Sequence, residues 1–187
     1  MKDLSNKKVV IIATDGFEHS ELTQPRDRLS DAGADVHVAA PEPGVIRGWS
    51  HGDWAQSEPV DKTIDQVAPR DYDAVVLPGG QINPDVLRLN DKVITLIQTF
   101  WSEGKVVAAV CHAPWLLIEA GLVKDRKVTS YPSIRTDVIN AGGHWNDHPV
   151  IADQGLVTSR NPGDLEDFCN KIAEEILEGR HDRREAA

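Results

Sequence analysis

Cys111 and His112 are the residues whose types and spacing most strongly indicate chemistry. They follow the apolar run Lys105–Val110 and open a helix-forming segment. A nucleophile on such a strand-to-helix turn has a strained backbone and requires small neighbours two residues away on each side, which Ala109 and Ala113 provide. Backbone N–H groups at a helix start favour negative charge, so we expect a lowered thiol pKa and a populated thiolate. His112 is a candidate base; the alternative is a buried cysteine that only packs.

A second candidate feature is Pro78-Gly79-Gly80, which follows another apolar run. Two glycines let the backbone approach a bound group closely and aim an N–H at it. We expect the N–H groups of Gly80 and His112 to form an oxyanion hole. An ordinary glycine turn is the alternative.

The third candidate is Glu18, which follows the first apolar run of the chain. A carboxylate beside a thiolate is electrostatically unfavourable. If Glu18 meets Cys111, it should therefore be protonated and donate a hydrogen bond to the sulfur. The alternative is a solvated acidic residue in a loop.

The segments that must position these residues alternate between strand-like and helix-like patterns. Short apolar runs predict buried strands at Lys7–Ala13, Asp35–Ala40, Asp73–Leu77 and Lys105–Val110. Amphipathic patterns predict helices at Glu21–Ala32, Asp91–Glu103, Ala113–Ala120, Ile134–Asn140 and Pro162–Leu177. Weaker patterns indicate a strand at Val128–Tyr131, a hairpin over Val150–Ile151 and Gly155–Ser159, and short antiparallel strands or loops within residues 41–70.

This alternation predicts parallel βαβ units in a doubly wound α/β sheet. Ligands on such sheets bind beyond the carboxyl ends of the strands, where all three candidate features fall. The 187 residues fit one domain. We expect its core at about residues 7–177 and a polar tail at 179–187.

Composition excludes several classes of function. With 20 basic and 30 acidic residues the formal charge is −10, which argues against binding to nucleic acid or to anionic membranes. Two cysteines suit a reducing compartment. The apolar run Val9–Ala13 is shorter than the roughly 7–15 residues of a signal peptide's apolar region or the ~20 of a membrane span. We expect a cytoplasmic protein.

The remaining candidates are weaker. His144 and His148 are four residues apart, but Pro149 and two preceding glycines argue against the helix that a metal-binding pair at this spacing needs. Cys169 lies in a predicted amphipathic helix and is expected to pack in the core. The sequence contains no glycine-rich nucleotide-binding pattern. We therefore expect neither a metal nor a cofactor.

Five segments together resemble the ThiJ/PfpI family, most closely its intracellular protease I and general-stress-protein branch. The resemblance covers about residues 7–177 and rests on Phe17-Glu18 with Glu21-Leu22, Leu77-Pro78-Gly79-Gly80, Ala109 through Pro114, Thr129-Ser130-Tyr131-Pro132 and Val138-Ile139-Asn140-Ala141-Gly142. It implies a flavodoxin-like three-layer sandwich with a mainly parallel sheet, a cysteine on the elbow, a buried glutamate that contacts it, and a homodimer or higher homo-oligomer.

The family's motifs place its elbow cysteine at Cys111, its histidine at His112 and its buried acid at Glu18. In the peptidase branch a glutamate from a neighbouring subunit completes a Cys-His-acid triad. Asp85 holds that place here, so the carboxylate is one methylene shorter. The alternative is that Asp85 only caps a short helix after Pro84.

The resemblance also implies the residues of the substrate pocket. Tyr131 is expected to line it. Trp115 is bulkier than the residue commonly found in the family and is expected to narrow it.

The leading functional hypothesis is a stress-response enzyme whose Cys111 thiolate attacks the carbonyl of α-oxoaldehydes or their adducts, as in a deglycase or glyoxalase. His112 would move protons and release a hydroxy acid. The same groups could cleave peptides through a thioester, so an intracellular cysteine peptidase is one alternative. A non-enzymatic redox sensor or holdase chaperone, with Cys111 oxidised rather than turned over, is another.

Overall fold

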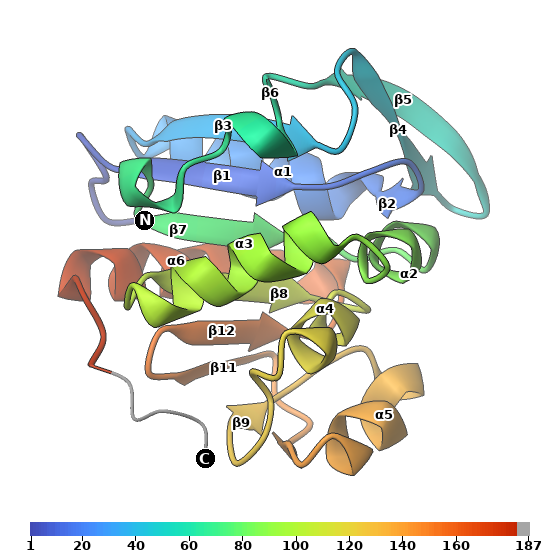
Figure 1. Cartoon of the computed structure of the whole chain (residues 1–187), viewed down its shortest axis with the longest axis vertical. Helices are drawn as coiled ribbons and strands as arrows, with labels where there is room; N and C mark the ends of the chain where they lie inside the picture. The colour runs from blue at the N-terminus through green and yellow to red at the C-terminus, as the bar shows by residue number, and fades with distance from the viewer. Residues whose placement is uncertain (183–187) are drawn as a thin grey trace.

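The computed structural model describes residues 1–182 and is built on a seven-stranded sheet in the order β11-β12-β8-β7-β1-β3-β6 (Figure 1). All neighbouring strands are parallel except β11 and β12. The strands are β1 Lys8–Ile12, β3 Asp35–Ala40, β6 Lys62–Thr63, β7 Ala74–Leu77, β8 Val106–Val110, β11 Val150–Asp153 and β12 Leu156–Ser159. The predicted α/β fold with a mainly parallel sheet is confirmed.

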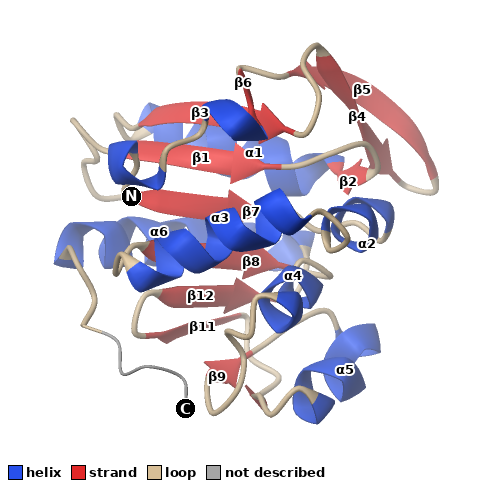
Figure 2. Cartoon of the chain, in the orientation of Figure 1, coloured by secondary structure: helices blue, strands red, loops and turns tan. Residues whose placement is uncertain are grey.

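Helices cover both faces of the sheet, as Figure 2 shows. Helices α3 (Asp91–Ser102) and α4 (Pro114–Glu119) cover one face, and α1 (His19–Asp31) and α6 (Leu165–Glu178) cover the other. Side chains of a strand point alternately to the two faces, so Val10 and Ile12 pack with α3 and α4, while Val9 and Ile11 pack with α1 and α6. The continuous apolar runs of the sequence follow from this burial on both sides.

The segment 41–70 contains the expected antiparallel strands. Strands β4 (Val45–Ser50) and β5 (Asp53–Pro59) form a hairpin, and the short strand β2 (Phe17–Glu18) runs parallel to β4. In Figure 1 the hairpin projects beyond the main sheet, on the side to which the parallel strands point. Strand β6, from the same segment, was not expected to join the main sheet, yet it pairs with β3.

Two further elements differ from the sequence-based expectation. The predicted strand 128–131 is only β9 (Lys127–Val128), which pairs with β10 (His144–Trp145). It ends early because the Tyr131 N–H donates to the Cys111 carbonyl oxygen (2.8 Å) instead of to a strand. Helix α2 (Ile82–Leu87) begins before Pro84, whereas the alternative for Asp85 placed a short helix after it. Helix α5 (Arg135–Asn140) lies where a helix was expected.

The ends of the chain bear on two further expectations. A 3-10 turn, Pro162–Asp164, precedes the last helix, so α6 begins three residues later than predicted. The polar tail expected at 179–187 is described to Asp182, and its residues 183–187 lie outside the described part.

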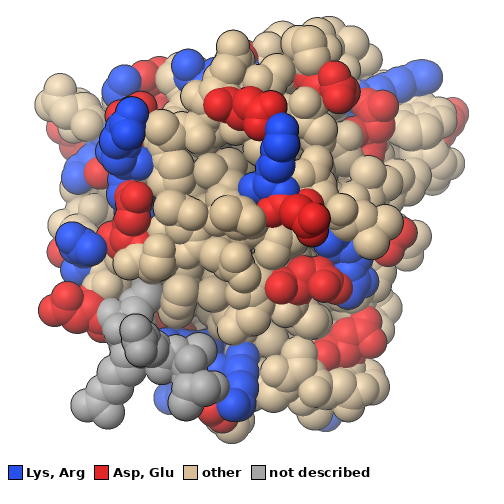
Figure 3. Space-filling view, in the orientation of Figure 1, with Lys and Arg blue, Asp and Glu red and all other residues tan. Residues whose placement is uncertain are grey.

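The carboxyl ends of β1, β7 and β8 lie at the same edge of the sheet, together with α2 and the start of α4 (Figure 1). This edge gathers the three segments from which chemistry was expected. Among the helices of residues 1–182, none is long and apolar enough to cross a membrane. On the face seen in Figure 3, Lys and Arg are scattered among Asp and Glu and form no continuous basic surface.

Candidate active site

Cys111 occupies the turn between β8 and α4 in a backbone conformation that side chains rarely adopt, with φ +64°. Its N–H donates to the Ser159 carbonyl oxygen at 3.0 Å, and its own carbonyl oxygen accepts from Tyr131. These bonds hold the strained turn from two sides. Ala109 and Ala113 are fully buried beside it, so the expected elbow is present.

Two backbone donors face the sulfur of Cys111. The N–H groups of Gly80 and His112 lie close enough to the sulfur to oppose the rise in the pKa of its thiol. Gly80 has φ +80°, and a Cβ at this position would lie 2.5 Å from the Gly16 carbonyl oxygen, so only glycine fits. Both donors predicted from the sequence are therefore at the thiol.

His112 is placed to exchange a proton with the thiol. Its Nδ1 lies 3.1 Å from Cys111 Sγ, and its Nε2 lies 3.1 Å from Ser133 Oγ. The ring of Tyr131 stacks on it with 4.9 Å between centroids. Burial lowers the pKa of His112, so the ring is neutral at pH 7 and able to accept a proton. The contact with Ser133 was not anticipated.

The buried acid that faces Cys111 is Glu21, and the assignment to Glu18 is wrong. Glu21 is fully buried, and its Oε2 accepts from the Gly79 N–H at 2.8 Å. Helix α1 begins at His19, so Glu18 precedes the first turn, partly exposed, and accepts from the Ser20 hydroxyl at 3.2 Å. Sequence periodicity offered a signal, because Glu21 lies four and eight residues before the buried Pro25 and Leu29 on one helix face.

The pKa of Glu21 is raised to about 8, mainly by burial and to a smaller extent by the negative charge of Glu18, against the opposing effects of Gly79 and Cys111. Glu21 therefore keeps its proton at neutral pH. Its Oε1 has no well-formed hydrogen bond within residues 1–182, although the Cys111 thiol is close enough to influence its pKa. A carboxyl O–H is thus available beside the sulfur.

The expected lowering of the thiol pKa is not found. Burial raises the pKa of Cys111 and an ionised Glu21 raises it further, which outweighs the N–H groups of Gly80 and His112. The resting state at neutral pH is a thiol next to a neutral imidazole. A thiolate formed by proton transfer to His112 would then face three donors: the two N–H groups and the Glu21 carboxyl.

Cys111 opens onto a cavity of about 300 Å³ at the carboxyl edge of the sheet. The residues that line it are Gly16, Glu18, Glu21, Trp49, Gly80, Gln81, Ile82, Cys111, His112, Tyr131 and Pro162. Tyr131 is at the cavity, as expected. Trp115 does not line the cavity. Its indole N–H donates to Asp137 at 2.8 Å, and its ring packs against the His112 ring with 5.4 Å between centroids. Trp49, from the hairpin, was missed because hairpin placement is not a local property of the sequence.

Asp85 lies in the first turn of α2, is exposed, and is absent from the lining of the cavity. Within the single chain it therefore does not serve His112. Its role across subunits stays a prediction.

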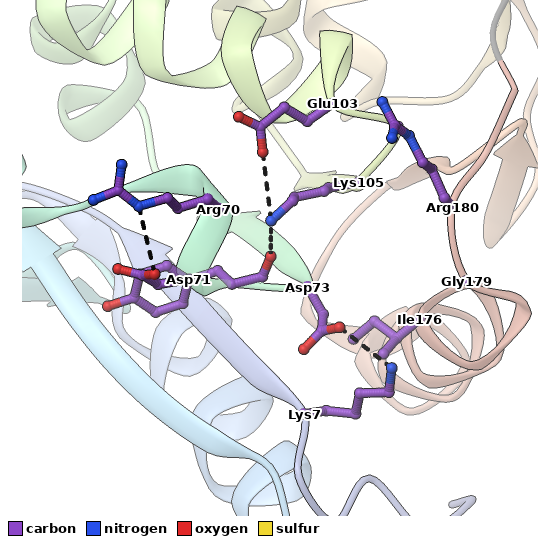
Figure 4. A pocket seen from close by; sticks show the side chains of 11 residues that line it. Lys7, Arg70, Asp71, Asp73, Glu103, Lys105, Ile176, Gly179 and Arg180 are labelled. Carbon is purple, nitrogen blue, oxygen red and sulfur yellow. Dashed lines mark hydrogen bonds and ion pairs between the residues drawn. The ribbon is translucent and has the colours of Figure 1, made fainter.

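A larger cavity, about 620 Å³, lies at the amino ends of the strands. Figure 4 shows that its charges face one another: Lys7 pairs with Asp73 at 3.3 Å and Lys105 with Glu103 at 3.5 Å. No cysteine or histidine of the described residues lines it. It offers neither a thiol nor an imidazole base, and its two lysines Lys7 and Lys105 are ion-paired. The smaller cavity, which holds both Cys111 and His112, is therefore the candidate active site.

One group within residues 1–182 has the composition of a metal site: Glu175, Glu178 and His181, whose ligand atoms lie within 4.8 Å of one another. Glu175 already accepts from the Gly155 N–H at 3.1 Å and lies 3.6 Å from His181. These residues are at the end of α6, away from the lining of the candidate active site.

Alkylation is expected to distinguish the two cysteines. Cys111 lines a cavity and has the base His112 beside it, whereas Cys169 is 0% exposed. Substoichiometric iodoacetamide followed by peptide mass mapping should therefore label Cys111 first. Preferential labelling of Cys169 would overturn this assignment.

The parallel sheet and the thiol on its elbow define a flavodoxin-like α/β protein with a cysteine, a base and a buried carboxyl at one site. The chain belongs to the DJ-1/PfpI family, whose model matches residues 7–175.

Three relatives illustrate this membership. The chain is 46% identical over 158 residues to deglycase PfpI of Pyrococcus furiosus, covering 84% of this chain and 92% of the relative. It is 41% identical to protein/nucleic acid deglycase 2 of Escherichia coli over 173 residues, or 92% and 98% of the two chains. The crystal structure of Drosophila melanogaster DJ-1beta superposes with a TM-score of 0.83 at 31% identity, covering 94% of this chain and 95% of the DJ-1beta chain.

Proposed function

We propose that this protein is a deglycase, which removes α-oxoaldehyde adducts from their carrier groups and releases a hydroxy acid. The observation that carries the proposal is Cys111 Sγ, 3.1 Å from a neutral His112 and faced by two N–H donors and the Glu21 carboxyl. The relatives named deglycases support it at 41–46% identity over most of the chain.

The first step forms a bond from sulfur to the adduct. As Cys111 attacks the carbinol carbon of R–X–CH(OH)–CO–CH₃, where X is the carrier's nitrogen or sulfur, His112 takes the thiol proton. The C–X bond breaks, and the proton held by His112 passes to X, so the carrier leaves as R–XH. The protein then holds S–CH(OH)–CO–CH₃.

The second step is an internal rearrangement followed by hydrolysis. A proton moves from the sulfur-bearing carbon to its neighbour, and the hydroxyl proton of the sulfur-bearing carbon passes to the neighbouring carbonyl oxygen. This isomerisation gives the thioester S–CO–CH(OH)–CH₃ without an external oxidant. Water attacks the thioester carbonyl, the C–S bond breaks, and the sulfur regains its proton. Overall, adduct and water give carrier and lactic acid. Gly80 and His112 N–H groups are placed to stabilise the oxyanion of the hydrolysis.

The direct test supplies wild type and Cys111→Ala with three substrates: a methylglyoxal adduct of a thiol, free methylglyoxal and a fluorogenic peptide. The proposal expects adduct turnover by the wild type and none by the variant. Peptide cleavage alone would instead identify a peptidase. Equal protection of a client protein by both variants, with no turnover, would identify a holdase.

We also propose that the active site is completed by a second copy of the chain. Asp85 lies on α2 beside Ile82, Val86 and Leu89, whose large apolar side chains are 41–85% exposed. An exposed apolar surface of this kind is typical of an interface. Asp85 from the second copy would supply the acid that orients the catalytic base His112. The family resemblance puts a glutamate of the neighbouring subunit in this place.

Subunit complementation is expected to reveal this arrangement. Neither Cys111→Ala nor Asp85→Asn homodimers have an intact Cys-His-acid site, but a mixed dimer has one. Random pairing of equal amounts should restore about a quarter of wild-type activity, since half of the dimers are mixed and each has one good site.

The control mixes Cys111→Ala with Cys111→Ser, neither of which supplies a thiol, and should recover nothing. Full activity of Asp85→Asn alone, or no recovery after subunit exchange, would contradict the shared site.

A further inference from the structure

The ionisable side chains that line the active-site cavity include acidic residues but no lysine or arginine among the described residues. Glu18 is one of these acidic residues. Glu18 is partly exposed, and its negative charge is felt by Glu21 deeper in the site. Since Glu21 is protonated and His112 neutral at pH 7, Glu18 supplies the negative charge of this lining. Coulomb interactions are stronger in a cavity than in bulk water.

Aromatic rings lie on the same lining. Strands β2 and β4 are parallel, and their register places Trp49 opposite Glu18. Both residues line the cavity, as does Tyr131, whose ring stacks on His112. A carboxylate combined with indole and phenol rings is the environment that proteins use to bind organic cations, through charge attraction and cation–π contact.

We propose that Glu18 is a specificity-determining residue that favours adducts whose carrier is positively charged near the reacting carbon, such as those on amino and guanidino groups. The inference rests on the proposed deglycase function. Anionic carriers meet repulsion from Glu18, with no lysine or arginine of the described lining to offset it. The hydroxy-acid product meets the same repulsion, which favours its release.

The test compares three methylglyoxal hemithioacetals that share the same reacting atoms and differ in carrier charge. Thiocholine is cationic and cannot condense through its quaternary nitrogen, 2-mercaptoethanol is neutral, and 3-mercaptopropionate is anionic. For wild type we expect kcat/KM to fall in that order. In Glu18→Gln the ratio of kcat/KM for the cationic adduct to that for the neutral adduct should fall about five- to tenfold. Any general effect of the variant on Cys111 cancels in this ratio.

The matched control is Glu42→Gln, which removes the same charge from an exposed carboxylate outside the lining of this cavity. This control should keep the wild-type ratio. The proposal is overturned if Glu18→Gln keeps that ratio too, or if wild type prefers the anionic adduct.

A binding measurement separates this proposal from the proposed function. Cys111→Ala should bind Nα-acetylarginine amide more tightly than its neutral counterpart Nα-acetylcitrulline amide, and adding Glu18→Gln should reduce the preference about five- to tenfold. If wild type turns over no adduct but the binding preference behaves in this way, the deglycase function fails and the role of Glu18 stands. If the two amides bind Cys111→Ala equally, the role of Glu18 fails whatever the turnover.

Discussion

Cys111→Ala is expected to lower kcat/KM for adduct hydrolysis by roughly 10³-fold or more, because removing a nucleophile leaves only substrate binding and the oxyanion donors. Alanine keeps the Cβ that the elbow requires, so the N–H groups of Gly80 and His112 stay in place. Cys111→Ser keeps a donor and acceptor but replaces the thiol with a much weaker nucleophile, and it should lose nearly as much. Lactate release from a methylglyoxal adduct measures both variants.

Cys169→Ala is the matched control, because Cys169 is a buried thiol on α6 that lines no part of the candidate active site. It should retain activity within about twofold, with at most a small loss of stability from the vacated core volume. Wild-type turnover by Cys111→Ala would show that the thiol is not the nucleophile.

Glu21→Gln is expected to change the pH dependence of stability. The pKa of Glu21 is about 8 in the folded protein, against a usual value of 4.5. The folded state therefore holds a proton that the unfolded state loses as pH rises above 4.5, and wild-type stability falls between pH 4.5 and 8 on this account. Glutamine does not titrate. The stability of Glu21→Gln relative to wild type should increase by about 3 kcal/mol between pH 4 and pH 7.

Urea unfolding of both proteins at several pH values measures this difference. Glu42→Gln provides the contrast, because it makes the same substitution at an exposed carboxylate outside the lining of the active-site cavity. A constant difference between Glu21→Gln and wild type from pH 4 to pH 8 would contradict a buried, protonated Glu21.

The parts of the fold that sequence reasoning predicted are those encoded locally. The strands Ala74–Leu77 and Val106–Val110 are buried on both faces, so their uninterrupted apolar runs were sufficient. The paired strand β6 was missed. Strand β6 has two residues, and its position depends on pairing with β3 across more than twenty residues of sequence. No local pattern carries that information.

The residues of the candidate site that were predicted correctly are likewise those that a local sequence pattern marks. Cys111, His112 and Gly80 were found because a strained turn requires particular residue types at fixed spacing. The choice between Glu18 and Glu21 depended on where α1 begins, and helix starts are only weakly marked in a sequence. The expected direction of the thiol pKa failed for a different reason. The helix-start donors are visible in the sequence, whereas the degree of burial is a property of the whole fold.

The central claim is that this protein acts on the adduct itself rather than on free methylglyoxal that the adduct releases. The most direct measurement follows release of carrier from a purified methylglyoxal adduct of Nα-acetylarginine amide, first without protein and then at increasing protein concentration. A deglycase should release carrier faster than the adduct dissociates spontaneously, in proportion to protein concentration and dependent on Cys111. Release that never exceeds the spontaneous rate, however much protein is added, would contradict the account and leave only consumption of free aldehyde.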